Sequence, residues 1–465
     1  MEKTFRTVLV NPPALSRAEM HDLPDYPHAG LAYLAGSLRD AGSSVRVVDA
    51  KLERLSIEET LDRVFQQDVD LVGITCMTHE IDSAIRLAES IKKTHNPPHI
   101  VVGGVHVTAL PAETLESYPE IDFTVFGEGE KTIVELVSAL QHGGGFEKIG
   151  GLAWRNGLLT RVNEVRQWDT SLDDLAYPAW DLFPEASEYH IVTARGCPYL
   201  CVFCMSPYGK EVRERSPENV IAEMRSVARR YRPRHYKIND ESFGFNSDRA
   251  KKLLELMIAH EEVRLIPKTA SLRANSVTED LMRQMKEAGF VYVDFGIESG
   301  DPEVLKRIKK GITLDVSRRA VACARAAGLT VGGNFIIGHP GETPETARKT
   351  IRFAVELNCD FNAFGIMTPY PGTQVYEMAK KNEYGYRMTS GDWRDFNKQL
   401  GGALELDGFP RFKLELYQLK GYVSVYLLNF RFLAFAKFVW KYRRAAIPFM
   451  RNSLHHLVVA QRDSP

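Results

Sequence analysis

The chain lacks any strong imbalance of charge and any clear export signal. Its 465 residues carry 59 lysines and arginines against 60 aspartates and glutamates, for a formal net charge of −1. No global basic field points to nucleic acid, so we expect no nucleic-acid partner. Residues 1–13 contain no long apolar stretch before a small-residue cleavage site, so we expect no secretory leader and a cytoplasmic location. With 44% hydrophobic and 26% charged residues, the composition is that of a globular protein of two or three domains.

Long apolar runs are also missing. The stretch 422–440 comes closest to a membrane span, but it contains Arg431 and Lys437, and positive charge continues to Arg444. We favour a helix that covers the core, with weak contact at a membrane surface as the alternative. Several aromatic residues of the C-terminal region 381–465 could contact a flat or apolar substrate, but most are expected in the core: Tyr384, Tyr386, Trp393, Phe396, Phe409 and Phe412.

Cysteine is scarce, and half of it falls in one place. Of six cysteines, Cys197, Cys201 and Cys204 lie within eight residues in a C-x3-C-x2-C pattern. Three thiolates on one loop can bind one metal centre, and three is one fewer than usually holds an iron–sulfur cube. No second cysteine pair or nearby histidine supports zinc. The spacing therefore predicts an iron–sulfur cluster with one iron open to another ligand. Isolated cysteines such as Cys76 are interpreted as structural.

The first 140 residues lack the glycine fingerprint of a dinucleotide site, because no G-x-G-x-x-G follows the first strand. Short apolar strands alternate there with amphipathic helices, which predicts an open, mostly parallel sheet. Ligands on such sheets bind beyond the carboxyl ends of the strands. The predicted strands are 7–10, 44–49, 70–75, 99–103 and 122–126.

After three glycines at 143–145, the sequence predicts a hairpin and an extended connector, and then a second β-α series. The strands predicted in that series are 190–195, 235–240, 265–272, 292–299, 330–338 and 361–370. Polar and glycine-rich groups follow these strands, and functional groups of barrels cluster at such ends.

The cysteine loop, with Phe203 before its last cysteine, resembles that of the radical S-adenosylmethionine (SAM) superfamily. The resemblance implies a partial (β/α)6 TIM barrel and a [4Fe-4S] cluster held by Cys197, Cys201 and Cys204. SAM would bind the open iron, and its reductive cleavage would give a 5′-deoxyadenosyl radical. The residues that the resemblance assigns to SAM are Phe203; Asp240 and Glu241 at the ammonium; Arg273 at the carboxylate; Glu298 and Ser299 at the ribose; and Gly338 at adenine.

The N-terminal region resembles the cobalamin-binding domain of a large branch of these enzymes. The resemblance rests on Gly-Leu-Ala-Tyr-Leu-Ala at 30–35, Gly-Gly-x-His-x-Thr at 103–108 and Gly-Glu-Gly-Glu at 127–130. The D-x-H-x-x-G motif that supplies a cobalt ligand is missing, as is common in this branch, and its absence is compatible with cobalamin bound without a protein ligand below cobalt. The positions assigned to cobalamin are Asn11, Pro12, Thr75, Met77, Thr78, Gly103, Gly104, His106 and Gly127.

The predicted fold class is therefore α/β, with a Rossmann-like parallel-sheet cobalamin-type domain, a partial barrel and a mainly helical C-terminal region. The predicted boundaries are 1–142 for the cobalamin-type domain, 143–185 for the linker, 186–380 for the radical SAM barrel and 381–465 for a region that closes the barrel or shapes the substrate pocket.

The branch resembled contains anaerobic magnesium-protoporphyrin cyclase, hopanoid methylases and natural-product C-methylases. We expect cobalamin-dependent methylation of an unactivated carbon on a small-molecule substrate, with a flavodoxin- or ferredoxin-type electron donor. One alternative is a radical cyclisation, ring contraction or diol dehydration with the cobalamin-type domain vestigial or differently used. A corrinoid carrier or sensor and a structural iron–sulfur scaffold are the others, but neither explains both the cysteines and the strand-end residues. The sequence assigns no residue to the substrate.

Overall fold

The computed structural model describes residues 5–16, 19–20, 23–157, 159–168, 170–241, 243–399 and 401–440. The chain divides into two compact units. The first contains residues 1–198 and 205–269, and the second contains residues 199–204 and 270–465. The cysteine loop is shared, because Cys197 belongs to the first unit while Cys201 and Cys204 belong to the second.

The first unit begins with a seven-stranded sheet in the order β2-β1-β3-β4-β5-β6-β7. The first five strands in the chain are mutually parallel, and the hairpin β6–β7 adds antiparallel strands at one edge. The bounds are β1 Arg6–Asn11, β2 Ser44–Asp49, β3 Leu71–Thr75, β4 His99–Gly103, β5 Phe123–Val125, β6 Leu152–Asn156 and β7 Leu159–Val162. The predicted parallel sheet and the predicted hairpin are confirmed.

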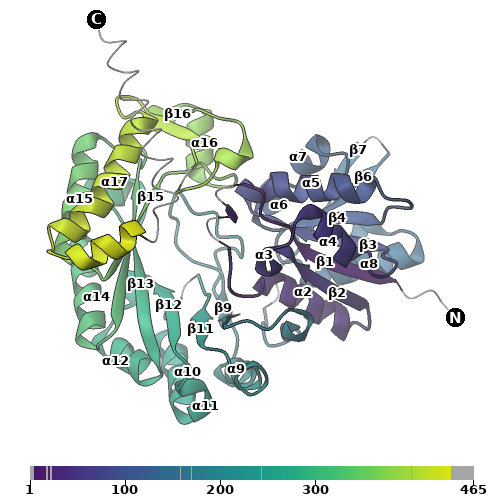
Figure 1. Cartoon of the computed structure of the whole chain (residues 1–465), viewed down its shortest axis with the longest axis horizontal. Helices are drawn as coiled ribbons and strands as arrows, with labels where there is room; N and C mark the ends of the chain where they lie inside the picture. Colours follow the sequence, from purple (N-terminus) through teal and green to yellow (C-terminus); the bar gives the residue numbers. More distant parts are fainter. Residues whose placement is uncertain are drawn as a thin grey trace, which may run out of the picture. The chain divides into compact units, whose positions relative to one another are not determined.

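Helices lie on either side of this sheet (Figure 1). Their ends follow local chemistry: the imidazole of His28 caps α2 by accepting from the Leu31 amide at 3.2 Å, and Ser56 and Glu59 form a capping box on α4. The bounds are α2 Ala29–Asp40, α3 Ala50–Glu53, α4 Ile57–Val64, η1 Thr78–Glu80, α5 Ile81–Lys92, α6 Val105–Ala109, α7 Pro111–Ser117, α8 Glu130–His142 and η2 Phe146–Lys148.

The first unit also contains the start of the second β-α series. Strand β8 pairs with β11 in parallel. The predicted strand 190–195 is wrong as one element, because the amides of Thr193 and Ala194 donate to the carboxylate of Asp240 and interrupt the pairing. Two strands result, β8 and β9, and β9 pairs with β10 in an antiparallel hairpin. The bounds are η3 Trp180–Leu182, β8 Glu188–Ile191, β9 Ala194–Arg195, β10 Arg213–Glu214, α9 Pro217–Tyr231, β11 His235–Ile238, α10 Ser247–Ala259 and α11 Glu261–Arg264.

The second unit continues the alternation, and β13, β14 and β15 are parallel neighbours within it. The predicted strand at 265–272 begins only at Lys268, because α11 and its cap occupy the preceding residues. The bounds are β12 Lys268–Leu272, η4 Ala274–Ser276, α12 Glu279–Glu287, β13 Phe290–Glu298, α13 Pro302–Arg307, α14 Leu314–Ala326, β14 Thr330–Ile337, α15 Pro344–Leu357, β15 Phe361–Ile366, α16 Gln374–Lys380, η5 Glu383–Gly385, β16 Tyr386–Met388, η6 Trp393–Asp395, β17 Leu404–Leu406 and α17 Arg411–Leu427.

Helix α17 covers β15, but the predicted core-covering stretch 422–440 does so only in its first part, because Phe430, Leu433 and Trp440 are 70–83% exposed. The side-chain amide of Gln418 donates to the Phe364 carbonyl at 2.7 Å. A Cβ at Gly421 would lie 2.8 Å from the Phe364 ring, so glycine permits the close approach. Tyr386, Phe396 and Phe409 are buried, as expected for core aromatics. No helix in the described ranges is long and apolar enough to cross a membrane, and residues 441–444 of the predicted basic stretch lie outside those ranges.

Candidate active site

The cysteine loop begins at the end of the β9–β10 hairpin. Gly196 has φ +92°, and a Cβ there would lie 2.0 Å from the Glu211 carbonyl oxygen, so only glycine fits. The amide of Cys197 donates to the Gly209 carbonyl at 3.1 Å. The hairpin backbone therefore fixes the position of Cys197, the first cysteine of the loop.

The other two thiols lie on a short turn held by the second unit. The amide of Val202 donates to the Ile308 carbonyl, the amide of Val375 donates to the Val202 carbonyl, and both distances are 3.1 Å. Val202 is buried, whereas Cys201 is half-buried and Cys204 is exposed. Burial of Val202 therefore anchors the turn between the two cysteines.

The donor set fits the cluster that the sequence predicts. None of the three cysteines forms a disulfide within the described ranges, and thiolates are the ligands of iron–sulfur clusters. As the side chains stand, no three His, Cys, Asp or Glu residues within the described ranges are gathered closely enough to hold a metal ion. The fit therefore rests on the chemistry and loop spacing of the thiols.

Arg273, at the end of β12, is a cation beside this turn. Its guanidinium lies 3.5 Å from the centroid of the Tyr199 ring, and its Nη1 lies 3.6 Å from Cys201 Sγ. Its Nε and Nη2 atoms are buried and have no hydrogen-bond partner in the described part of the chain. Buried donors without acceptors are costly. A carboxylate would satisfy both donors at once, so the geometry suits the predicted contact with the SAM carboxylate.

Glu298 ends β13 with a left-handed backbone at φ +69°. Its Oε1 forms a buried ion pair with Nζ of Lys310 at 2.9 Å, and the same Nζ lies 5.9 Å from the centroid of the Phe203 ring. Lys310 thus connects a predicted SAM residue to the aromatic residue of the cysteine turn. Sequence reasoning missed Lys310, although the Lys-Lys-Gly run after a predicted strand–helix unit was a signal for it.

Gly338, at the end of β14, adopts φ +95°. The amides of Gly338 and His339 both donate to Oε2 of Glu342, while its Oε1 is buried without a partner in the described ranges. Burial raises the pKa of Glu342 to about 7. Burial also lowers the pKa of His339 to about 4, and its ring lies 6.1 Å from that of Phe203. At neutral pH, an uncharged imidazole therefore faces the aromatic residue of the turn.

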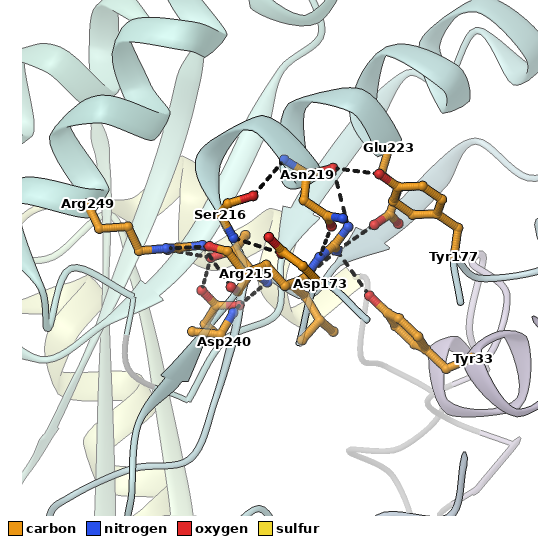
Figure 2. A network of polar contacts seen from close by, with 12 residues as sticks. Tyr33, Asp173, Tyr177, Arg215, Ser216, Asn219, Glu223, Asp240 and Arg249 are labelled. Carbon is orange, nitrogen blue, oxygen red and sulfur yellow. Dashed lines mark hydrogen bonds and ion pairs between the residues drawn. The ribbon is translucent and has the colours of Figure 1, made fainter. Parts of the chain in front are cut away.

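Asp240 and Ser299 are occupied within the fold. Oδ1 of Asp240 accepts from the Thr193 and Ala194 amides at 2.6 and 3.1 Å, and Oδ2 accepts from the Thr193 hydroxyl at 2.5 Å (Figure 2). The Ser299 hydroxyl lies 3.1 Å from that of Thr350. These contacts hold the strand ends in place, and the SAM contacts of both residues stay predictions.

Glu241, by contrast, lies next to the cysteine loop. Burial raises the pKa of its carboxyl group, and a hydrogen bond from the Gly196 backbone opposes that rise. The hydroxyl of Ser206 is 3.5 Å from its Oε2. Glu241 therefore contacts the residue that precedes Cys197, which is compatible with the predicted ammonium contact.

The cobalamin-type positions cluster at the carboxyl edge of the N-terminal sheet. Asn11 donates to Oδ1 of Asp49 at 2.7 Å, and Oδ2 of Asp49 accepts from the His28 amide at 3.0 Å. Pro12 and Thr78 are buried, Thr75 is half-buried, and Met77 is 49% exposed. A buried ion pair between Lys51 and Glu80 also lies at this edge and was not predicted, although both residues follow strand ends.

Glycines keep this edge open. A Cβ at Gly103 would meet only the Val125 carbonyl, at 3.8 Å, and one at Gly127 would meet only the Trp168 ring, at 3.8 Å. Gly104 has φ +108°, and a Cβ there would lie 2.4 Å from the Cys76 carbonyl oxygen. His106 is buried, and burial lowers its pKa to about 4. Open glycines beside an exposed thioether fit a large, flat macrocycle.

Comparison with known proteins gives the same two parts. Residues 22–137 match the B12-binding domain family, and residues 191–354 match the radical SAM superfamily. An uncharacterised methyltransferase of Pyrococcus horikoshii is 36% identical over 435 residues, which cover 91% of this chain and 93% of that protein. The chain belongs to the B12-binding radical SAM enzymes.

More distant members extend the family. An anaerobic magnesium-protoporphyrin IX monomethyl ester cyclase of Rubrivivax gelatinosus is 26% identical over 387 residues, covering 80% of this chain and 69% of that enzyme. The structure of the radical SAM methyltransferase TsrM from Kitasatospora setae, with cobalamin and a [4Fe-4S] cluster bound, superposes with a TM-score of 0.73 at 20% identity, over 92% and 91% of the two chains. That likeness shows the fold.

Membership confirms several predictions made from the sequence. The chain is a radical SAM enzyme with a B12-binding domain, and its cofactors are a [4Fe-4S] cluster, SAM and cobalamin. The matched stretches fall inside the predicted domains 1–142 and 186–380. The boundaries themselves stay predictions, as do the individual contacts of the site residues.

Proposed function

We propose that this enzyme methylates an unactivated carbon of a small-molecule substrate in a cobalamin-dependent radical reaction. The observation that carries the proposal is Arg273: its Nη1 lies 3.6 Å from Cys201 Sγ, and its Nε and Nη2 are buried donors that no described residue satisfies. A cation of this kind beside a cysteine turn suits the carboxylate of SAM bound at an iron–sulfur cluster.

The chain's own residues have separate tasks in this proposal. The three thiolates hold the cluster, and Arg273 orients SAM by its carboxylate. Glu298 neutralises the ammonium group of Lys310, which lies near the Phe203 ring. The glycines at the N-terminal strand ends leave room for the corrinoid face. When bound, these cofactors supply a 5′-deoxyadenosyl radical and a transferable methyl group. Positioning the target carbon between two reactive centres lowers the entropic part of the barrier.

Methyl transfer is favoured over other radical reactions by the relatives. The Pyrococcus relative is named a methyltransferase, and so are a cytidylyl-2-hydroxyethylphosphonate methyltransferase of Streptomyces wedmorensis and a hopanoid C-3 methylase of Methylococcus capsulatus. The magnesium-protoporphyrin cyclase shows that one family member is named for a cyclisation. A radical cyclisation is therefore the second candidate. Either reaction requires a one-electron donor, for which we propose a flavodoxin or ferredoxin.

The first test concerns the cluster. After anaerobic reconstitution the protein should hold about four iron and four sulfide, and Cys201→Ala should abolish the formation of 5′-deoxyadenosine from SAM. Cys323→Ala, on α14 in the same unit, is the matched control and should cleave SAM normally. Unimpaired cleavage by Cys201→Ala would reject the cluster assignment.

The second test separates the two candidate reactions. The protein is purified with hydroxocobalamin and then incubated with SAM labelled in its methyl group. A stoichiometric corrinoid spectrum, with the label transferred to the bound corrinoid, supports methylation. A protein that cleaves SAM but binds no corrinoid favours the cyclisation-type reaction instead.

A further inference from the structure

The β9–β10 hairpin carries Cys197 at its end and is rich in arginine. Arg195 pairs with Arg213 and Ala194 with Glu214 across the hairpin, and the Arg215 amide donates to the Thr193 carbonyl at 3.0 Å. Arg195 is two residues before Cys197. A shift of strand β9 would therefore also move Cys197, the first cysteine of the loop.

The three arginine side chains of the hairpin are buried. Arg195, Arg213 and Arg215 are only 3–4% exposed. A guanidinium removed from water must be paired with an anion and hydrogen-bonded, because an uncompensated buried charge is strongly unfavourable. The partners of these three residues therefore decide where the hairpin can lie.

Two of the arginines contact anions that follow strand β5: Glu128 lies in the turn before α8, and Glu130 is the first residue of α8. Nη1 and Nη2 of Arg213 contact the two oxygens of Glu128 at 3.0 and 2.8 Å. Nη2 of Arg195 contacts Glu130 at 2.5 Å, and its Nη1 contacts Glu128 at 3.1 Å. Both glutamates are themselves buried. Two cations and two anions thus form a closed, neutral set.

The third arginine is also joined to the N-terminal sheet. Nη1 of Arg215 donates to the Tyr33 hydroxyl of α2 at 3.2 Å and to Glu223 of α9 at 2.5 Å (Figure 2). The guanidinium of Arg195 lies 5.2 Å from the centroid of the same Tyr33 ring. Two elements that flank the N-terminal sheet therefore contact the hairpin: the Gly-Glu-Gly-Glu turn and helix α2.

The turn that supplies the anions also contains Gly127, one of the positions predicted to meet cobalamin. We propose that Glu128 and Glu130 are positioning residues, which act on Cys197 through Arg213 and Arg195. Binding of cobalamin at the N-terminal strand ends would then change the position of the cysteine loop through these ion pairs. The inference rests on cobalamin binding, as in the proposed function. A neutral charge set in a low-dielectric interior is stiff, because separating its members leaves bare buried charges. Movement of the turn is therefore transmitted to the hairpin.

The test uses hydrogen–deuterium exchange of the full chain with its reconstituted cluster, before and after addition of hydroxocobalamin. Peptides covering residues 194–215 should exchange more slowly when the corrinoid binds. Glu130→Gln should keep its iron and its corrinoid but lose this protection, and the EPR signal of its reduced cluster should no longer respond to the corrinoid. Glu135→Gln is the matched control, because Glu135 lies on the same helix and pairs with the side chain of Arg166. It should behave like the unmodified protein.

The outcomes separate the two proposals. Protection that is present in the unmodified protein and in Glu135→Gln but lost in Glu130→Gln supports the coupling. A bound corrinoid with unchanged exchange at 194–215, or with the same change in Glu130→Gln, overturns the coupling and leaves the proposed function standing. An absent corrinoid spectrum overturns both. If Glu130→Gln fails to fold, Arg213→Lys replaces it, since lysine keeps the charge but not the two-point contact with Glu128.

Discussion

The strand ends of the barrel series and those of the N-terminal sheet solve different binding problems. Beside the cysteine turn, Arg273 has two buried donors that no residue in the described ranges satisfies. At the N-terminal sheet, Asn11, Asp49 and the His28 amide satisfy one another, while open space at Gly103 and the exposed Met77 thioether remain. A charged ligand is recognised by charge, and a large macrocycle by shape and apolar surface. The two edges therefore differ in which kind of substitution should damage them.

Arg273→Ala should break the charge-based edge and is expected to have the largest effect. Two hydrogen bonds to a charged group are worth about 3 kcal/mol together, so SAM affinity should fall roughly 100-fold. Isothermal titration of the anaerobic, cluster-loaded protein measures it. Arg325→Ala removes a guanidinium that contacts the Leu357 and Asn358 carbonyls instead, and it should bind SAM normally. Equal affinities of the two variants would contradict the assignment of Arg273.

The pH dependence of stability tests whether the buried Glu342 carboxyl group, near Gly338, is protonated in the folded protein. Its pKa of about 7 in the folded protein exceeds the usual 4.5, so the folded state binds the proton more tightly than the unfolded chain does. This contribution to stability is complete below about pH 4.5 and is lost as the pH rises through 7. Relative to Glu342→Gln, the unmodified protein should therefore lose about 2 kcal/mol of unfolding free energy between pH 5 and pH 8.

Urea unfolding of both proteins across that pH range measures the difference. Glu345→Gln, three residues away and exposed, serves as the control and should unfold like the unmodified protein. A constant difference between Glu342→Gln and the unmodified protein would mean that Glu342 is charged in the fold.

Met77→Ala should produce the smallest effect and acts on the shape-based edge. Because 49% of the side chain is exposed, its loss should cost little stability. Removing its apolar contact area should weaken corrinoid binding by about 1 kcal/mol, or roughly fivefold. Titration with hydroxocobalamin checks this, with the exposed Leu159→Ala on β7 as the control. Unchanged affinity in Met77→Ala would remove this residue from the corrinoid site.

Elements that local patterns determine were predictable from the sequence. Strands β2 and β4 have the predicted bounds, because strand alternation and the glycines that follow strands act over a few residues. The cysteine ligands were equally accessible, since their spacing is local.

Features that depend on partners far along the chain were not predictable. The split between β8 and β9 arises because the Thr193 amide donates a hydrogen bond to the carboxylate of Asp240, 47 residues further along the chain. Lys310 belongs to the site because of its ion pair with Glu298, a contact that the sequence pattern does not reveal. The Gly-Glu-Gly-Glu turn was recognised for its glycines, whereas its two glutamates are the buried counter-ions of arginines 65 and 85 residues away. Charge pairing across such separations leaves no periodic signature.

The buried arginines of the hairpin also constrain how such enzymes can be recombined. Arg195 and Arg213 belong to the segment that carries the cysteines, and their anions Glu128 and Glu130 belong to the preceding module. A chimera that exchanges the first module for one without both glutamates would enclose two uncompensated guanidinium groups. The two modules must therefore be inherited, grafted or redesigned as a matched pair.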